Sequence, residues 1–238
     1  AWPAGKYKNR VRLYLPFEEG NGTTAFDRST RGNHGNLTNA TNAACVTTGV
    51  GACPRWTAGK FGQGLEFDGI GDYVSISNPA NFDFGSTADF SLEAWVKTAS
   101  TVQMTPVGKF NSAGDTGYQL LTQSGTIQMR TQSNTVNGIV ISDNAWHHVV
   151  GVRDTSGTRL LIYVDGILRG SGTFTAENVN SDGVLAVGRA GSYNGNYWNG
   201  TIDEVAVYNK TLSPAEIRRH YLDGLQRHGV IKSDSFKI

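Results

Sequence analysis

The sequence predicts an all-β fold, an antiparallel two-sheet sandwich. Glycine contributes 30 of the 238 residues, while charged residues make up only 17%, a balance that favours turn-rich β structure over a helical bundle. Short segments of alternating apolar and polar residues recur from Arg12 to Tyr208, separated by clusters of Gly, Asn, Asp and Ser. Such alternation is typical of antiparallel sheets. A single sandwich domain can have this length.

The predicted strands are short and spread along the chain. Asp165-Gly166 marks the clearest hairpin, because a two-residue turn needs positive φ and this pair adopts it readily. The strands are expected near Arg12–Phe17, Gly64–Phe67, Asp72–Ser75, Phe90–Lys97, Pro106–Lys109, Gly117–Thr122, Thr126–Thr131, Gly138–Ile141, His147–Asp154, Arg159–Val164, Ile167–Gly170, Val184–Val187 and Thr201–Tyr208.

One short helix is predicted near the C-terminus. Ser213 is a favourable N-cap, Pro214 suits the first helical position, and Glu216 completes a capping box. The helix is expected to end near Leu222, ahead of Gly224.

Charge and hydropathy exclude two classes of partner. The 21 basic and 20 acidic residues give a net charge of +1, whereas nucleic-acid-binding domains carry a basic excess or stripe. No apolar run approaches the roughly 20 residues that cross a bilayer. Neither nucleic-acid binding nor membrane insertion is therefore expected.

The two cysteines and the chain ends bear on compartment and domain organisation. Cys45 and Cys53 are separated by seven small, flexible residues and are expected to form a local disulfide, two free thiols being the alternative. The chain starts with alanine rather than methionine, so a mature secreted chain or an excised domain is expected. Residues 11–226 are expected to form one domain between unpatterned tails at 1–10 and 227–238.

Several short motifs occur in a fixed order along the chain. They are LYLPFEEGNGT at 13–23, DRS at 27–29, GNHG at 32–35, GQGLEFDG at 62–69, DYV at 72–74, FSLEAWVK at 90–97, WHHV at 146–149, YVDG at 163–166, NGTIDEV at 199–205 and LSPAEI at 212–217. Together they cover about residues 11–222 and resemble the laminin G-like (concanavalin A-like lectin/glucanase) family. The resemblance implies a jelly-roll sandwich, but this fold carries sugar-binding modules, adhesion domains and a few enzymes.

The resemblance also implies a structural Ca²⁺ between the opening loop and the Ile-Asp-Glu segment. Asp27 and Asp203 would supply carboxylates, and Asn33, His34 or Gly22 would supply amide or main-chain oxygens, which are the ligand types that calcium prefers. In the alternative, Asp27 forms an Asx-turn and Asp203 pairs with an arginine or a backbone N–H.

Two candidate catalytic groups are weak. Glu66-x-Asp68 could begin a glucanase Glu-x-Asp-x-x-Glu strand, but residue 71 is Gly. His147 and His148 are neighbours on one predicted strand, so their imidazoles point to opposite faces and cannot act on one substrate atom. No catalytic residue is predicted, and the protein is not expected to be an enzyme.

A polar face of the strand at 90–97 is a candidate sugar platform. Glu93 and Trp95 share this face, and Arg130 could line the same groove. A tryptophan ring stacks on sugar C–H faces, while polar neighbours hydrogen-bond to hydroxyls. In the alternative, Trp95 fills a second core layer.

The loop at 191–200 places aromatic residues among Gly and Asn. Tyr193 is the freest candidate for ligand contact, and Tyr197 is a second one. Tyr197 and Trp198 both lie where the family usually packs an aromatic residue against the sheet, so at least one of them is expected to be structural.

These observations favour a secreted or cell-surface, non-catalytic carbohydrate-binding or adhesion module with a structural calcium, whose partner is a polysaccharide or glycan. The first alternative is a structural subunit of a surface layer, appendage or fibre, in which the tails bind other copies or cell-surface proteins. A glycan hydrolase or lyase is the second alternative.

Overall fold

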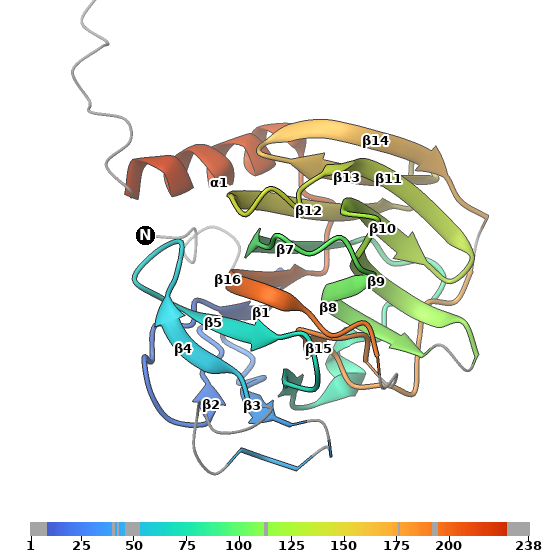
Figure 1. Cartoon of the computed structure of the whole chain (residues 1–238). Coiled ribbons are helices and arrows are strands. Elements are labelled where there is room, and N and C mark those ends of the chain that lie inside the picture. Colours follow the sequence, from blue (N-terminus) through green and yellow to red (C-terminus); the bar gives the residue numbers. More distant parts are fainter. Residues whose placement is uncertain are drawn as a thin grey trace, which may run out of the picture.

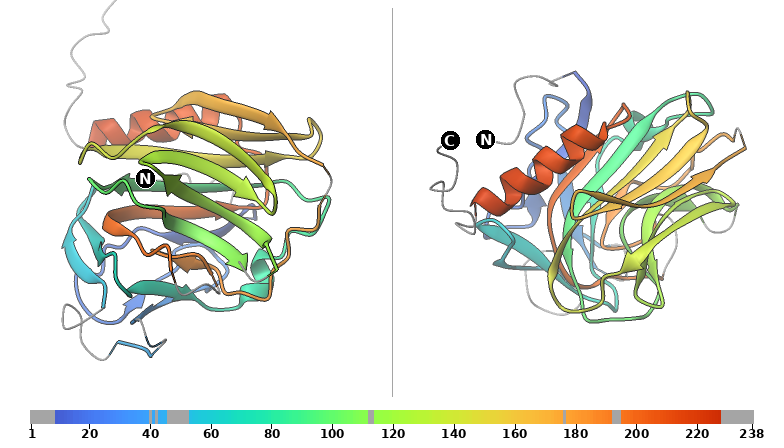
Figure 2. Two further views of the ribbon diagram at one scale, coloured as in Figure 1. Left: turned by 45° about the vertical axis from the view of Figure 1, so that its right-hand side comes forward. Right: turned by 90° about the horizontal axis from the view of Figure 1, so that it is seen from above.

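Two antiparallel sheets pack face to face, and the helix α1 (Pro214–Arg227) lies on the outer side of one of them (Figure 1, Figure 2). The computed structural model describes residues 9–39, 41, 43–45, 53–111, 114–175, 177–191 and 195–227. The predicted all-β sandwich with a C-terminal helix is confirmed. The predicted tails lie mostly outside the described residues.

Each sheet of the described chain contains eight strands. The first has the order β14 (Ile167–Thr173), β13 (Arg159–Val164), β12 (Trp146–Asp154), β7 (Phe90–Lys97), β16 (Asn199–Tyr208), β5 (Gln63–Asp68) and β4 (Arg55–Ala58), with β1 (Val11–Leu15) also paired to β16. The second has the order β11 (Asn134–Val140), β10 (Thr126–Thr131), β9 (Thr116–Gln123), β8 (Met104–Asn111), β15 (Ala186–Val187), β6 (Tyr73–Ile76), β3 (Gly35–Thr38) and β2 (Thr24–Ala25). A 3-10 turn covers Pro79–Phe82.

The main core lies between the two sheets. Alternation on β7 sends Leu92 and Val96 inward, where both are fully buried. They belong to one apolar cluster with Val74, Leu120 and Val187 of the facing sheet. Removal of this surface from water is the main stabilising contribution to the sandwich.

A second, smaller core lies where α1 meets the first sheet. Ile217 of α1 is fully buried in a cluster that includes Val150 and Tyr208. The predicted capping box is present, because the Glu216 N–H donates to Ser213 Oγ (3.3 Å) and the Ser213 N–H donates to Glu216 Oε2 (2.8 Å). The helix is therefore anchored to the sheet by an apolar face.

The helix continues beyond its predicted end. It passes through Gly224 to Arg227, so the expected end near Leu222 was wrong. A Cβ atom at residue 224 would lie 2.6 Å from the ring of Trp95. This glycine lets the helix approach the tryptophan and does not end it.

The sequence pattern identified the long strands better than the short edge strands. The hairpin between β13 and β14 is confirmed, with φ of 54° at Asp165 and 73° at Gly166. β2, β3 and β4 were not predicted, because two to four residues are too few to establish alternation. In the described part of the chain, α1 is too short and too polar to span a bilayer.

Candidate functional site

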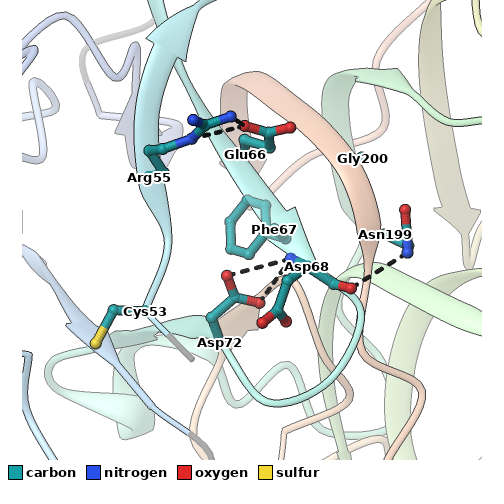
Figure 3. Close-up of a pocket in the computed structure, with 8 residues that line it drawn as sticks. All are labelled: Cys53, Arg55, Glu66, Phe67, Asp68, Asp72, Asn199 and Gly200. Atoms are coloured by element: carbon teal, nitrogen blue, oxygen red, sulfur yellow. Dashed lines mark hydrogen bonds and ion pairs between the residues drawn. The ribbon is translucent and has the colours of Figure 1, made fainter. Parts of the chain in front are cut away.

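A polar pocket of about 370 Å³ lies at the end of β5, flanked by β4 and β16 (Figure 3). Its floor is the last part of β5, from Glu66 to Asp68. The ring of Phe67 belongs to the main core, so the neighbouring carboxylates at 66 and 68 are directed away from that core. The lining residues are Cys53, Arg55, Glu66, Phe67, Asp68, Asp72, Asn199 and Gly200.

Strand register brings donors and acceptors together in this pocket. Arg55 on β4 is the direct cross-strand partner of Glu66, and their side chains form an ion pair. Asn199 on β16 faces Asp68, and its amide donates to the Asp68 carbonyl oxygen at 3.2 Å. Residues separated by more than 130 positions thus meet on three adjacent strands.

The loop after β5 closes one side of the pocket. Asp68 Oδ1 accepts the Ile70 N–H at 2.7 Å and the Gly71 N–H at 3.3 Å, which fixes a tight turn. Gly69 in this turn has a φ of 80°, and a Cβ there would lie 2.9 Å from the Cβ of Asn199. A side chain at position 69 would therefore displace Asn199 from the pocket wall.

Asp72 is an unusual carboxyl group in this loop. It is 2% exposed, and both of its oxygens accept the Asp68 N–H, at 3.1 and 3.2 Å. Burial raises the pKa of Asp72 to about 8, and the neighbouring Asp68 carboxylate adds to the shift. Asp72 is therefore mostly protonated at neutral pH.

The pocket offers both hydrogen-bond donors and acceptors. The Arg55 guanidinium and the Asn199 amide donate, while Glu66 and Asp68 accept. With Asp72 protonated, one cation stands against two carboxylates, so the pocket does not favour an anionic ligand. Its size and mixed polarity suit an uncharged ligand rich in hydroxyl groups.

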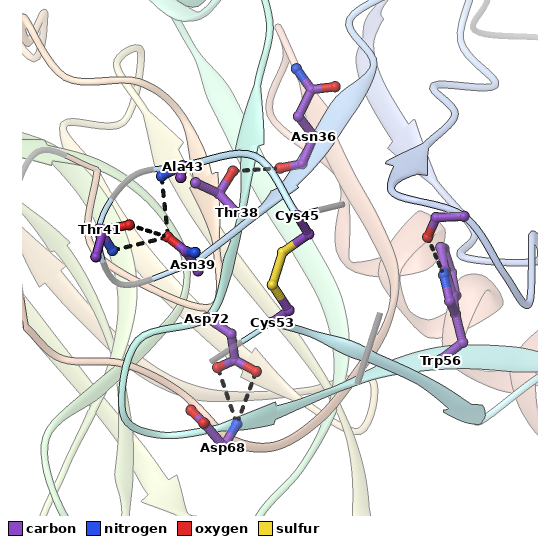
Figure 4. Close-up of a disulfide and its surroundings, with 11 residues drawn as sticks. Asn36, Thr38, Asn39, Thr41, Ala43, Cys45, Cys53, Trp56, Asp68 and Asp72 are labelled. Atoms are coloured by element: carbon purple, nitrogen blue, oxygen red, sulfur yellow. Dashed lines mark hydrogen bonds between the residues drawn. A yellow bond between two sulfur atoms is a disulfide. The ribbon is translucent and has the colours of Figure 1, made fainter. Parts of the chain in front are cut away.

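The predicted disulfide between Cys45 and Cys53 is confirmed and supports the edge of this pocket (Figure 4). Cys53 lines the pocket two residues before Arg55. On the next residue of β4, Trp56 donates its Nε1–H to the Gly22 carbonyl oxygen at 2.8 Å. The short edge strand is thus held by a covalent bond and a side-chain hydrogen bond.

The predicted sugar platform on β7 is covered by α1. Trp95 is 1% exposed and Glu93 is fully buried, with the Trp95 ring stacked on Tyr221 of the helix at 5.8 Å. The expectation of an open platform was wrong, and the alternative of a second core layer describes this face. The sequence did not indicate that a helix about 120 residues later would cover it.

The structure places Arg130 away from Trp95 and describes only one of the two predicted tyrosines. Arg130 lies on β10 of the second sheet, paired with Asp115 and stacked on Phe110 at 4.7 Å. It shares no groove with Trp95, because the two residues lie on different sheets and both point away from the main core. Tyr193 lies outside the described residues. Tyr197 is half-buried, two residues before Asn199 of the pocket.

The side-chain oxygens of the three calcium ligands implied by the resemblance all accept hydrogen bonds within the chain. Both Asp27 oxygens are occupied by hydrogen-bond donors, including the Asn33 N–H at 2.8 Å, as in the Asx-turn alternative. The Asn33 side-chain oxygen accepts from Asn81. Both Asp203 oxygens are occupied as well, because Oδ2 accepts the Phe61 N–H at 2.9 Å and Oδ1 accepts the Glu204 N–H at 2.7 Å, as in the backbone N–H alternative. Burial raises the pKa of Asp203 to about 8, and nearby Glu204 contributes. Within the described residues, no three His, Cys, Asp or Glu side chains form a group able to hold a metal.

The weak catalytic candidates are occupied by structural contacts. Glu66 is paired with Arg55, and Asp68 caps the loop after β5. His147 contacts Asp165 near the surface, whereas His148 is buried against Glu93 at 2.6 Å. As predicted, the two imidazoles do not share a site.

The sequence did not single out Arg55, Asp72 and Asn199, which carry the pocket. Arg55 lies in a strand that was not predicted, and Asn199 comes from a distant part of the chain. The available signals were the opposite charges of residues 55 and 66 and the Asp68-Gly69 turn. These signals predict a pocket only when the register of β4 and β16 against β5 is known.

Comparison with known proteins agrees with this architecture. Residues 68–218 match the family described as the concanavalin A-like lectin/glucanases superfamily. No curated protein has a significantly similar sequence.

Solved structures of low sequence identity share the fold. The binding domain of Paraclostridial Mosquitocidal Protein 1 aligns with a TM-score of 0.68 and 14% identity over 90% of this chain, which spans about half (52%) of that domain. Domain 4 of AbnA, a GH43 extracellular arabinanase from Geobacillus stearothermophilus, solved in complex with arabinotriose, has a TM-score of 0.63 and 17% identity, covering 88% of this chain and 97% of that one. The binding domain of Botulinum neurotoxin DC, in complex with rat synaptotagmin II, has a TM-score of 0.64 and 13% identity, covering 91% and 52%.

Proposed function

The chain belongs to the concanavalin A-like lectin/glucanases superfamily, and we propose that it is a non-catalytic carbohydrate-binding module whose pocket at the end of β5 takes a neutral glycan. The observation that carries the proposal is the pairing of exposed donors and acceptors in one pocket. Arg55 and Glu66 keep 63% and 40% of their side-chain surface exposed, so hydroxyl groups of a ligand can reach both.

The charge of the pocket selects among glycans. Uronic acids and sulfated sugars would meet Glu66 and Asp68, which repel them. Neutral pentose and hexose chains carry no such penalty. The complex of AbnA domain 4 with arabinotriose is an example of a similarly folded domain with a neutral pentose oligosaccharide, and it makes arabinotriose a suitable first probe.

A secreted or cell-surface location accompanies this proposal. The Cys45–Cys53 disulfide supports it, because disulfides persist in oxidising compartments. A structural calcium at Asp203 is a further part of the proposal, supported by the burial of two neighbouring carboxyl groups, Asp203 and Glu204, whose charges a cation would offset.

A glycan array with the full chain and Arg55→Gln tests the proposal. We expect signals on neutral glycans that weaken in the variant, no signals on acidic glycans, and no release of reducing ends from the neutral ones. Arg159→Gln is the matched control, because Arg159 is a similarly exposed arginine (53%) in an ion pair on β13. Binding only to acidic glycans would contradict the charge argument. A blank array would favour the alternative of an assembly or protein-receptor module.

A further inference from the structure

We infer that a second glycan-binding site lies on the other side of β4, in a cavity of about 390 Å³ lined by Glu19, Phe26, Arg28 and the segment 21–24. The inference deepens the proposed function, since both sites would take neutral sugars. It rests on separate residues and can fail separately.

The cavity has the aromatic platform that the first pocket lacks. Ala25 is buried, and the next residue, Phe26, points the other way and is 43% exposed. Its ring is held by His34, whose ring meets it edge-on at 5.3 Å, and by the Arg28 guanidinium at 5.7 Å from the ring centroid. A fixed, half-open ring can stack on the C–H face of a sugar with little loss of conformational entropy.

Glu19 supplies an acceptor that the chain leaves unused. Its side chain is 92% buried, since 8% is exposed. Oε1 accepts long hydrogen bonds from the Phe26 N–H (3.4 Å) and from Arg28 (3.3 Å). Among the described residues, Oε2 has no hydrogen-bond partner. A buried carboxylate oxygen without a donor is costly, and a small rotation of the Glu19 side chain would bring this oxygen to a sugar hydroxyl at the cavity wall.

The charges define the ligand class. Arg28 and Glu19 form an ion pair, so the cavity carries no excess charge from this pair and gives an anion no advantage. Arg28 retains 55% of its side-chain surface exposed and can donate to hydroxyl groups. Thr23 and Thr24 also line the cavity. An aromatic ring surrounded by such groups suits a neutral sugar.

The two sites are physically connected through β4. Arg55 lines the first pocket, whereas the next residue, Trp56, points to the opposite side of the strand and donates to the carbonyl oxygen of Gly22 in the second cavity. A glycan chain that passes around this sheet edge could engage both sites, so each weak contact would reinforce the other.

Two-dimensional amide NMR of the full chain tests the second site. The probes are arabinotriose, xylotriose, cellotriose and mannotriose, each titrated separately. We expect at least one probe to shift the amides of Gly22, Thr24 and Arg28. Phe26→Ala should weaken that response at least tenfold and leave the responses of Asp68 and Gly200 in the first pocket unchanged.

Two further variants keep the result interpretable. Leu168→Ala removes a similarly exposed apolar side chain (48%) on β14, at the edge of the first sheet opposite to β4, and should change neither response. Glu19→Gln keeps the shape of the side chain and should weaken only the second-site response, so it serves if Phe26→Ala does not fold.

Each remaining outcome is decisive. Shifts at Asp68 and Gly200 with none at Gly22, Thr24 and Arg28 would overturn the second site alone. The reverse pattern would overturn the first pocket and support the second site. No shift with any probe would overturn both.

Discussion

His220 on α1 and Glu93 on β7 form a buried ion pair, with His220 Nδ1 3.0 and 3.2 Å from the two carboxylate oxygens. His148 reaches the same carboxylate at 2.6 Å. Burial opposes both charges, yet Glu93 raises the pKa of His220, and the two histidines lower the pKa of Glu93. This pair fastens the helix to the sheet.

The pair makes stability depend on pH. Because the pKa of His220 is raised in the folded state, His220 contributes stability below about pH 6.5, and this contribution is lost as the pH rises through the His220 pKa of the folded protein. Because the pKa of Glu93 is lowered in the folded state, Glu93 contributes stability above about pH 4.5, and this contribution is lost on acidification. Glu93→Gln should therefore destabilise the protein most between these pH values, by about 3 kcal/mol. Urea unfolding from pH 4 to 9 measures this. An equal loss at every pH would show that packing, not the ion pair, holds the helix.

Asp72 gives a second pH dependence. Its folded pKa of about 8 exceeds the usual 3.8, so the native state retains a proton that the unfolded state has lost, and stability falls as pH rises from about 4 to 8. Asp72→Asn should gain roughly 2–4 kcal/mol relative to the wild type between pH 5 and 8. The exposed Asp182→Asn is the control. If the free energies of unfolding of Asp72→Asn and the wild type depended on pH in the same way, the raised pKa of Asp72 would be contradicted.

The disulfide should contribute measurably to stability. It joins cysteines eight positions apart, and closure of a loop this short is worth about 2–3 kcal/mol. Reduction with dithiothreitol should lower the urea midpoint accordingly and weaken glycan binding, because Cys53 lines the pocket. The double variant Cys45→Ala/Cys53→Ala should not respond to the reductant. If dithiothreitol also lowered the urea midpoint of the double variant, the loss of stability would not come from the Cys45–Cys53 disulfide.

Calcium is tested by thermal unfolding with calcium chloride or EDTA. We expect calcium to raise the Tm, and Asp203→Asn to abolish that increment by removing the buried carboxylate. Asp27→Asn should lower the Tm equally in both solutions, since Asp27 accepts hydrogen bonds within its own loop. Identical wild-type melts in calcium and EDTA would exclude a stabilising calcium.

The parts that the sequence predicted are those set by local pattern. Alternation located β7 and β12, Asp165-Gly166 located the hairpin, and Ser213 with Glu216 located the start of the helix. These signals lie within a few residues of the structure that they predict.

The parts that were missed depend on distant segments. The burial of Trp95 follows from the docking of α1, and the pocket follows from the register of β4 and β16 against β5. No local pattern shows which distant strand will place Arg55 beside Glu66.

The most direct test of the central claim is calorimetric titration of the full chain with arabinotriose and the other neutral trisaccharides, beside Arg55→Gln and Arg159→Gln. We predict saturable binding that Arg55→Gln weakens about tenfold, the equivalent of one lost charge-assisted hydrogen bond, and that Arg159→Gln leaves unchanged. Equal affinity of the wild type and Arg55→Gln, or no binding of any neutral trisaccharide, would contradict the assignment of the β5 pocket as a glycan site.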